Sequence, residues 1–148
     1  MTTAVDPIFV DTNVLIYARS AGSPFHAPAV ARLHTLETAG VPLWIGRQML
    51  REYLAGLTRP GATAPPIPLP DLVSDVRAFQ QRFRIAEDGA AVTQHLEALL
   101  LAVPCGGRQV YDANIVATML AYEIPNLLTH NVADFTRFAS SITVVPLV

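Results

Sequence analysis

Acidic residues stand where short apolar segments end or where apolar helical segments begin. Asp11 directly follows the apolar residues 8–10, although aspartate is depleted within strands. Glu52 lies one to two turns into one expected helix, and Asp112 lies at the start of another. Carboxylates gathered at one place repel one another unless a cation neutralises them. Because such hard oxygen ligands suit Mg²⁺ or Mn²⁺, these three residues are candidates for a divalent metal site.

Two further polar residues, Asn131 and Asp134, follow an expected strand that ends at Thr129. A structural explanation competes for each acid, since an aspartate at a helix start usually caps the helix or interacts with its dipole. Glu52 taken alone would be an ordinary exposed helix residue. Whether these residues form a site therefore depends on whether the fold brings them together.

The elements that must position these residues alternate between strands and helices. Strands are expected over residues 8–10, 43–45, 84–86, 126–129 and 142–145. Helices are expected over residues 14–18, 25–39, 47–57, 71–83, 88–103 and 110–122, the end at Val103 being approximate. Asp71 and Asp88 are the expected caps of the helices that they begin. Residues 59–70 are rich in proline and should form an extended loop, and Asp134 should lie in a short helical turn.

This alternation predicts an α/β protein, a three-layer α/β/α sandwich in which helices cover both faces of a mainly parallel sheet. We expect residues 1–148 to form one domain, because 51% hydrophobic residues supply a sizeable core. Sites in such sheets lie at the carboxyl ends of the strands. The five candidate residues should therefore converge on one edge of the sheet.

The composition excludes several classes of protein. Cys105 is the only cysteine, so no intramolecular disulfide is possible. The segment Met1 to Asp6 has no basic residue before the first apolar run, and no apolar stretch reaches the length of a membrane span. We therefore expect a cytoplasmic protein that does not enter a membrane. The net charge of −2 argues mildly against broad, non-specific binding of nucleic acid.

Three segments resemble the sequence motifs of PIN-domain ribonucleases. They are residues 9–17 (FVDTNVLIY), 110–117 (VYDANIVA) and 129–135 (THNVADF), with Glu52 on a helix between the first two. Each motif is weak alone, but the order and spacing make the combination specific, and the resemblance covers essentially the whole chain. The chain length and residues 57–60 are most similar to the VapC-type toxins. Many relatives have an acid where this chain has Asn131, so the fourth acidic position falls to Asn131 or Asp134.

The resemblance implies a Mg²⁺- or Mn²⁺-dependent endoribonuclease that acts as the toxin of a type II toxin–antitoxin system. Asp11 and Asp112 would be metal ligands, and Glu52 would hold a metal-bound water or act as the base. Thr12 and Asn13 would fix the Asp11 carboxylate. The implied partners are an RNA substrate, a VapB-type antitoxin and a second copy of the chain.

Two other functions remain open at this point. The first alternative to the ribonuclease is another metal-dependent phosphoesterase. The second is a PIN-like binding module without catalytic activity, although the three acids together argue against it. Arg47, Arg51 and Arg108 lie close in sequence to the proposed ligands. They either contact the RNA backbone or form ion pairs with the acidic site.

Overall fold

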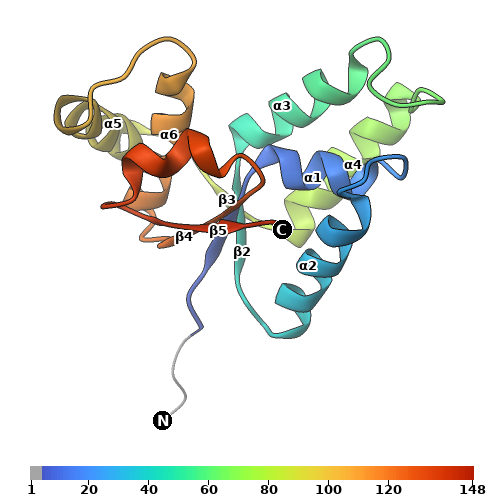
Figure 1. Ribbon diagram of the computed structural model, residues 1–148, viewed down its shortest axis with the longest axis horizontal. Helices are drawn as coiled ribbons and strands as arrows, with labels where there is room; N and C mark the ends of the chain where they lie inside the picture. The colour runs from blue at the N-terminus through green and yellow to red at the C-terminus, as the bar shows by residue number, and fades with distance from the viewer. Residues whose placement is uncertain (1–4) are drawn as a thin grey trace.

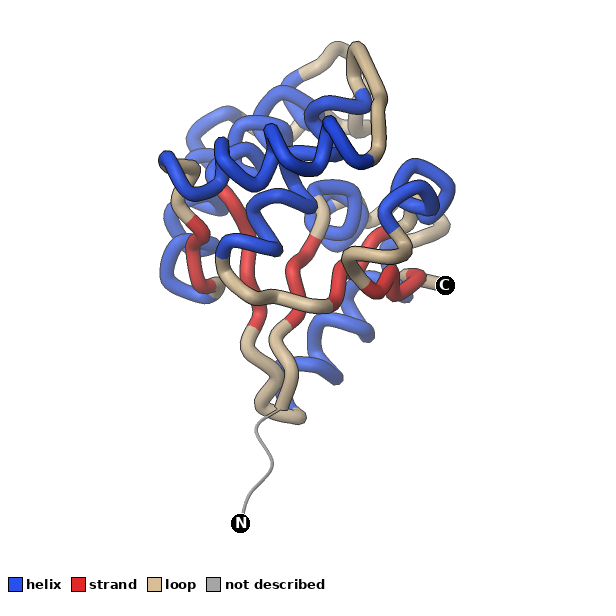
Figure 2. Tube along the Cα trace, turned by 90° about the vertical axis from the view of Figure 1, so that its left-hand side faces the viewer, coloured by secondary structure: helices blue, strands red, loops and turns tan. Residues whose placement is uncertain are grey.

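The computed structural model describes residues 5–148, so most of the N-terminal segment that lacks a basic residue lies outside the described residues. Five strands form one sheet in the order β3-β2-β1-β4-β5, and every neighbouring pair is parallel. The strands are β1 (Ile8–Val10), β2 (Leu43–Gly46), β3 (Arg84–Ala86), β4 (Asn126–Thr129) and β5 (Thr143–Pro146). In the view of Figure 2, the strands gather at the centre of the molecule with helices around them.

Helices cover both faces of this sheet. They are α1 (Thr12–Arg19), α2 (His26–Thr38), α3 (Arg47–Thr58), α4 (Leu69–Arg82), α5 (Ala90–Ala102), α6 (Gln109–Ala121) and the 3₁₀-helix η1 (Val132–Phe138). Figure 1 shows α1 to α4 on one side of the sheet, with α5, α6 and η1 on the other. The predicted three-layer α/β/α sandwich with a parallel sheet is therefore confirmed.

The central strand β1 is apolar throughout because helices cover it on both sides. Ile8, Phe9 and Val10 are all buried, as expected for a strand inside a parallel sheet. Helix α6 contributes a tightly packed face in which Ala113 and Val116 have no exposed surface. The core thus fixes β1 and α6, whose ends carry Asp11 and Asp112.

Two predicted helix caps are wrong. Helix α4 begins at Leu69, so Asp71 lies in its first turn and Pro68 occupies the cap position. Pro70 fits this early turn because a helix needs no N–H donor there. Helix α5 is capped by Gly89 without a side-chain hydrogen bond. The Asp88 carboxylate instead accepts a 3.5 Å hydrogen bond from the Asn114 amide, which ties the start of α5 to α6.

The other element boundaries agree with expectation to within one or two residues. Strand β5 begins one residue later than expected, and the proline-rich loop ends where α4 begins. Among the described residues, no helix has the length and apolar character needed to cross a membrane.

Candidate active site

Asp11 lies at the junction of β1 and α1, where it is the N-cap of the helix. Its Oδ1 accepts a 2.8 Å hydrogen bond from the Thr12 backbone N–H. Its Oδ2 accepts hydrogen bonds from the Thr129 hydroxyl at 2.8 Å and from the Asn13 amide at 3.1 Å. Val10 pairs with Leu128 in the sheet, so Asp11 stands level with Thr129 on the neighbouring strand. The expectation that Thr12 and Asn13 hold this carboxylate agrees with these bonds.

Burial of the Asp11 carboxylate disfavours its charged form. Burial raises its pKa to about 6, while the hydrogen bonds from Thr129 and Thr12 act in the opposite direction. The negative charge of Glu52 raises the pKa further, and the Asn13 bond lowers it. A buried carboxylate that is held in one orientation but lacks a positive partner favours binding of a cation.

Glu52 is presented by α3, which begins directly after β2. Its carboxylate accepts a 3.1 Å hydrogen bond from the Thr12 hydroxyl and a hydrogen bond from the Gln48 amide one turn earlier. Thr12 therefore bonds to both acids, to Asp11 through its backbone and to Glu52 through its side chain. The Glu52 side chain remains exposed to solvent, which leaves its oxygens accessible to water.

Asp112 lies in the first turn of α6 and is half-buried. Burial raises its pKa to about 6, and the negative charges of Asp134, Asp11 and Glu52 add to the effect in that order. Arg137 lowers the pKa to a smaller extent. Acids from four separate segments of the chain therefore share one electrostatic field.

Asn131 and Asp134 both lie at the start of η1 and are exposed. Asn131 occupies the cap position, and its backbone N–H donates to the Thr129 hydroxyl oxygen at 3.0 Å. Asp134 lies in the first turn, and its charge raises the pKa of Asp112. Of the two candidates for the fourth acidic position, Asp134 is thus the one that carries charge into the site.

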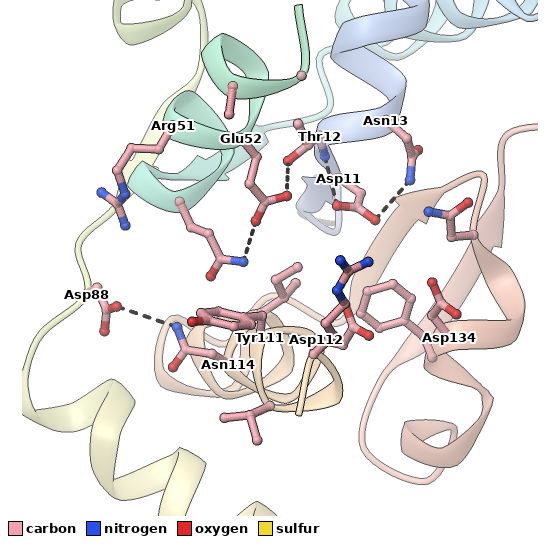
Figure 3. A pocket seen from close by; sticks show the side chains of 18 of the residues that line it. Asp11, Thr12, Asn13, Arg51, Glu52, Asp88, Tyr111, Asp112, Asn114 and Asp134 are labelled. Carbon is pink, nitrogen blue, oxygen red and sulfur yellow. Dashed lines mark hydrogen bonds between the residues drawn. The ribbon is translucent and has the colours of Figure 1, made fainter. Parts of the chain in front are cut away.

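One pocket of about 1030 Å³ is lined by all five candidate residues, Asp11, Glu52, Asp112, Asn131 and Asp134. Figure 3 shows Asp11 and Glu52 on the wall formed by α1 and α3, with Asp112 on the facing helix α6. The convergence expected from the sequence is therefore present in the structure, at the carboxyl ends of β1, β2 and β4.

The donor atoms in this pocket suit a hard divalent cation. Within residues 5–148, no three histidine, cysteine, aspartate or glutamate side chains are already close enough to form a metal site. The carboxylates are nevertheless close enough to raise the pKa of Asp112. Such a set fits a cation held by two carboxylates, with water completing its shell, as Mg²⁺ prefers.

The arginines are placed differently from one another. Arg47 forms a 2.7 Å ion pair with Glu87, so the interpretation that it pairs with the acidic site is wrong. Arg51 and Arg108 line the pocket, as does Arg59. None of these three forms an ion pair with another residue in the described part of the chain. They leave positive charge at the pocket wall.

Two residues that hold the acids in place were not assigned a role from the sequence. Thr129 is fully buried and bonds to Asp11. The available signal was a hydroxyl residue closing an apolar strand. Gln48, which bonds to Glu52, stands four residues before it on the same helix face.

The PIN domain family matches residues 8–140, so this chain belongs to the PIN-domain family. No curated protein matches the chain in sequence. Solved structures share its fold over nearly their whole length. One is the VapBC2 complex from Rickettsia felis bound to a promoter DNA fragment, with a TM-score of 0.70 and 18% identity over 94% of this chain and 97% of that chain.

Two further structures have the same fold. A toxin–antitoxin complex from Klebsiella pneumoniae gives a TM-score of 0.66 and 22% identity, covering 96% of this chain and 98% of that chain. VapC20 from Mycobacterium tuberculosis is described as a toxin that cleaves the sarcin–ricin loop. It gives a TM-score of 0.63 and 19% identity, covering 92% of this chain and 96% of that chain. At these identities the likeness establishes the fold.

Proposed function

We propose that this chain is a divalent-metal-dependent endoribonuclease and the toxin of a type II toxin–antitoxin system. The observation that carries the proposal is the convergence of Asp11, Glu52, Asp112 and Asp134 on one pocket of a PIN-domain fold. The pKa of Asp112 is raised by burial and by three neighbouring acids, as is typical of a cation site.

Asp11 and Asp112 are the proposed ligands of a single Mg²⁺ or Mn²⁺ ion, with Asp134 adding negative charge nearby. When bound, such an ion lowers the pKa of a water molecule and stabilises charge on a phosphate. Thr129, Thr12 and Asn13 hold the Asp11 carboxylate in one orientation. Glu52, fixed by Thr12 and Gln48, accepts the proton of the attacking water or orients that water.

The proposed substrate is RNA, and the products carry a 5′-phosphate and a 3′-hydroxyl. The RNA-cleaving activity in the description of VapC20 supports this substrate, since the two chains share a fold. The toxin–antitoxin complexes among the similar structures support a VapB-type antitoxin as the protein partner. A homodimer is proposed on the family resemblance alone.

The test is cleavage of single-stranded RNA, structured RNA, DNA and small phosphoesters, with Mg²⁺, with Mn²⁺ and with a chelator. We expect metal-dependent cleavage of RNA by the wild-type protein and loss of that cleavage in Asp11→Asn and Glu52→Gln. Cleavage of small phosphoesters without RNA cleavage would identify another phosphoesterase. Folded protein that binds RNA but cleaves nothing would identify a binding module.

The toxin role is tested by growth of a bacterial host. Expression of the wild-type chain should arrest growth, whereas the Asp112→Asn variant should not. Co-expression of a protein encoded beside the gene should restore growth and yield a stable complex. A wild-type chain that is active on RNA yet harmless to the host contradicts the toxin role and leaves the nuclease role intact.

A further inference from the structure

The pocket extends well beyond the acidic residues. Its volume of about 1030 Å³ is at the upper end of the range for small-molecule sites, roughly 300–1,000 Å³. A metal ion and its waters occupy a small part of such a space. In Figure 3, Asp134 lies at one end of the pocket, and Arg51, Asp88 and Asn114 lie at the other. The second end has no role in the proposed mechanism.

Tyr111 differs from the other tyrosines of the chain. It directly precedes Asp112 in the first turn of α6, and it is 65% exposed. Tyr17, Tyr53 and Tyr122 each pack against another aromatic ring. Across residues 5–148, the Tyr111 ring has no aromatic neighbour and its hydroxyl forms no hydrogen bond. Its ring is therefore available to a ligand in the pocket.

Positive charge lies across the pocket from this ring. Figure 3 shows Arg51 on helix α3, on the wall that faces Tyr111. Arg59, the C-cap residue of α3, also lines the pocket. Arg108 lines it from the side of the ring itself, as the N-cap residue of α6 one turn before Tyr111. In the described part of the chain, Arg51 therefore presents a guanidinium group without an ion pair opposite an aromatic ring. This pairing matches the chemistry of a nucleotide, which presents a flat base and a charged phosphate.

We propose that Tyr111 stacks on an unpaired nucleobase next to the phosphate that is cleaved, while Arg51 binds an adjacent backbone phosphate. The inference rests on the proposed ribonuclease function and adds to it the two residues that bind the RNA strand beside the acids. Both faces of a base inside a duplex are covered by its neighbours, so stacking on Tyr111 requires a base in a single strand, loop or bulge. Tyr111 is then a substrate-binding residue for the RNA strand.

The first test compares cleavage by wild type, Tyr111→Phe and Tyr111→Ala on a short single-stranded RNA. Loss of one stacking contact lowers kcat/KM roughly 5- to 150-fold in Tyr111→Ala, whereas Tyr111→Phe keeps the ring and stays near wild type. The matched control is Leu101→Ala, which removes a side chain that is 85% exposed and does not line the pocket. Circular dichroism confirms that each variant is folded, and Tyr111→Leu replaces Tyr111→Ala if the latter is not.

The second test removes the base instead of the ring. An RNA with an abasic nucleotide next to the cleaved phosphate should lower wild-type kcat/KM by a similar factor. The same RNA should give little further loss with Tyr111→Ala, because each change removes the same contact. Binding of a 2-aminopurine-labelled RNA without metal supplies an independent readout, since stacking on Tyr111 quenches the probe and Tyr111→Ala restores its fluorescence.

The outcomes separate this inference from the proposed function. Equal kcat/KM for wild type and Tyr111→Ala, or equal cleavage of duplex and single strand, overturns the stacking role while RNA cleavage by the wild type stands. Additive losses in the abasic test also overturn it. If Tyr111→Ala weakens only the antitoxin complex, the ring binds protein and the inference is wrong. A wild-type chain that neither cleaves nor binds RNA overturns both.

Discussion

The Thr129 hydroxyl donates a 2.8 Å hydrogen bond to Asp11 Oδ2 across the neighbouring strands β4 and β1. The Thr129 hydroxyl oxygen also accepts hydrogen bonds from the Asn13 amide at 3.1 Å and from the Asn131 backbone N–H at 3.0 Å. A hydroxyl has one hydrogen to donate and two lone pairs. All of its capacity is used, so Thr129 joins β1, β4 and the start of η1 at the site.

The substitution Thr129→Val should therefore lower both stability and activity. It keeps the side-chain volume nearly constant and removes a buried hydrogen bond to a carboxylate, worth roughly 1.5–3 kcal/mol in the free energy of unfolding. Loss of this bond also raises the pKa of Asp11, since the bond lowers it in the wild type. The acid limb of the pH–rate profile should consequently move to higher pH, which chemical denaturation and cleavage assays together will measure.

The control for this prediction is Thr129→Ser, which retains the hydroxyl. We expect its pH–rate profile to match that of wild type, with a modest loss of stability from the missing methyl group. A profile that moves equally in the serine and valine variants would show that the hydroxyl does not act through Asp11.

Asp112→Asn should stabilise the metal-free protein at neutral pH. The folded-state pKa of Asp112 is about 6 against an ordinary value of 3.8, so between these values the folded protein holds more protons than the unfolded chain. Stability therefore falls as pH rises through this window, and the full loss is present above it. Removing the charge should raise the Tm most at about pH 7.5 and leave it nearly unchanged only below the ordinary pKa of 3.8.

The measurement is thermal unfolding in the presence of a chelator. Glu97→Gln is the control, because it removes one negative charge from an exposed position on α5 that does not line the pocket. Equal changes in Tm for both variants would show that the stabilisation comes from the change in net charge and not from the position of Asp112. In titration calorimetry, Asp112→Asn should also weaken binding of Mn²⁺. Loss of a carboxylate with a purely structural role would leave that binding unchanged.

The sequence predicted the layers, the sheet class and the convergence of the acids because each depends on local patterns. The buried run before Asp11 and the apolar periodicity around Asp112 mark the ends of a strand and a helix. Parallel strands then place those ends at one edge. The roles of individual residues at that edge stay predictions, since their placement alone does not demonstrate catalysis.

Other features depended on contacts between distant segments. The pairing of Arg47 with Glu87 joins residues 40 positions apart, and no local pattern selects that partner over a nearby acid. Asp88 likewise does not cap α5, and its carboxylate bonds instead to Asn114, 26 positions away. Thr129 acquired its role through the register of β4 against β1, which hydropathy does not specify.

Asp134→Ala should lower activity with little change in stability. A capping role would require a side-chain hydrogen bond at the start of η1, and no such bond is present. The side chain is exposed, so we expect the free energy of unfolding to change by no more than about 0.5 kcal/mol. Metal affinity should fall because negative charge is lost near Asp112. A large drop in Tm with unchanged kcat on the same sample would instead identify a structural role.

Asn131→Asp should tighten metal binding, because it adds a carboxylate to a pocket that already contains Asp112 and Asp134. Ligand charge helps to set the affinity for hard cations, and in water two unit charges about 4 Å apart interact by roughly 1 kcal/mol. A gain of several-fold in Mn²⁺ affinity is therefore expected, together with a lower Tm of the metal-free protein from added repulsion. Gln81→Glu makes the same change in net charge at an exposed position on α4 outside the pocket. If both variants bind Mn²⁺ equally well in titration calorimetry, residue 131 is too far from the metal to affect its binding. If Asn131→Asp binds two ions per chain, the amide of Asn131 is what limits the wild-type protein to a single metal.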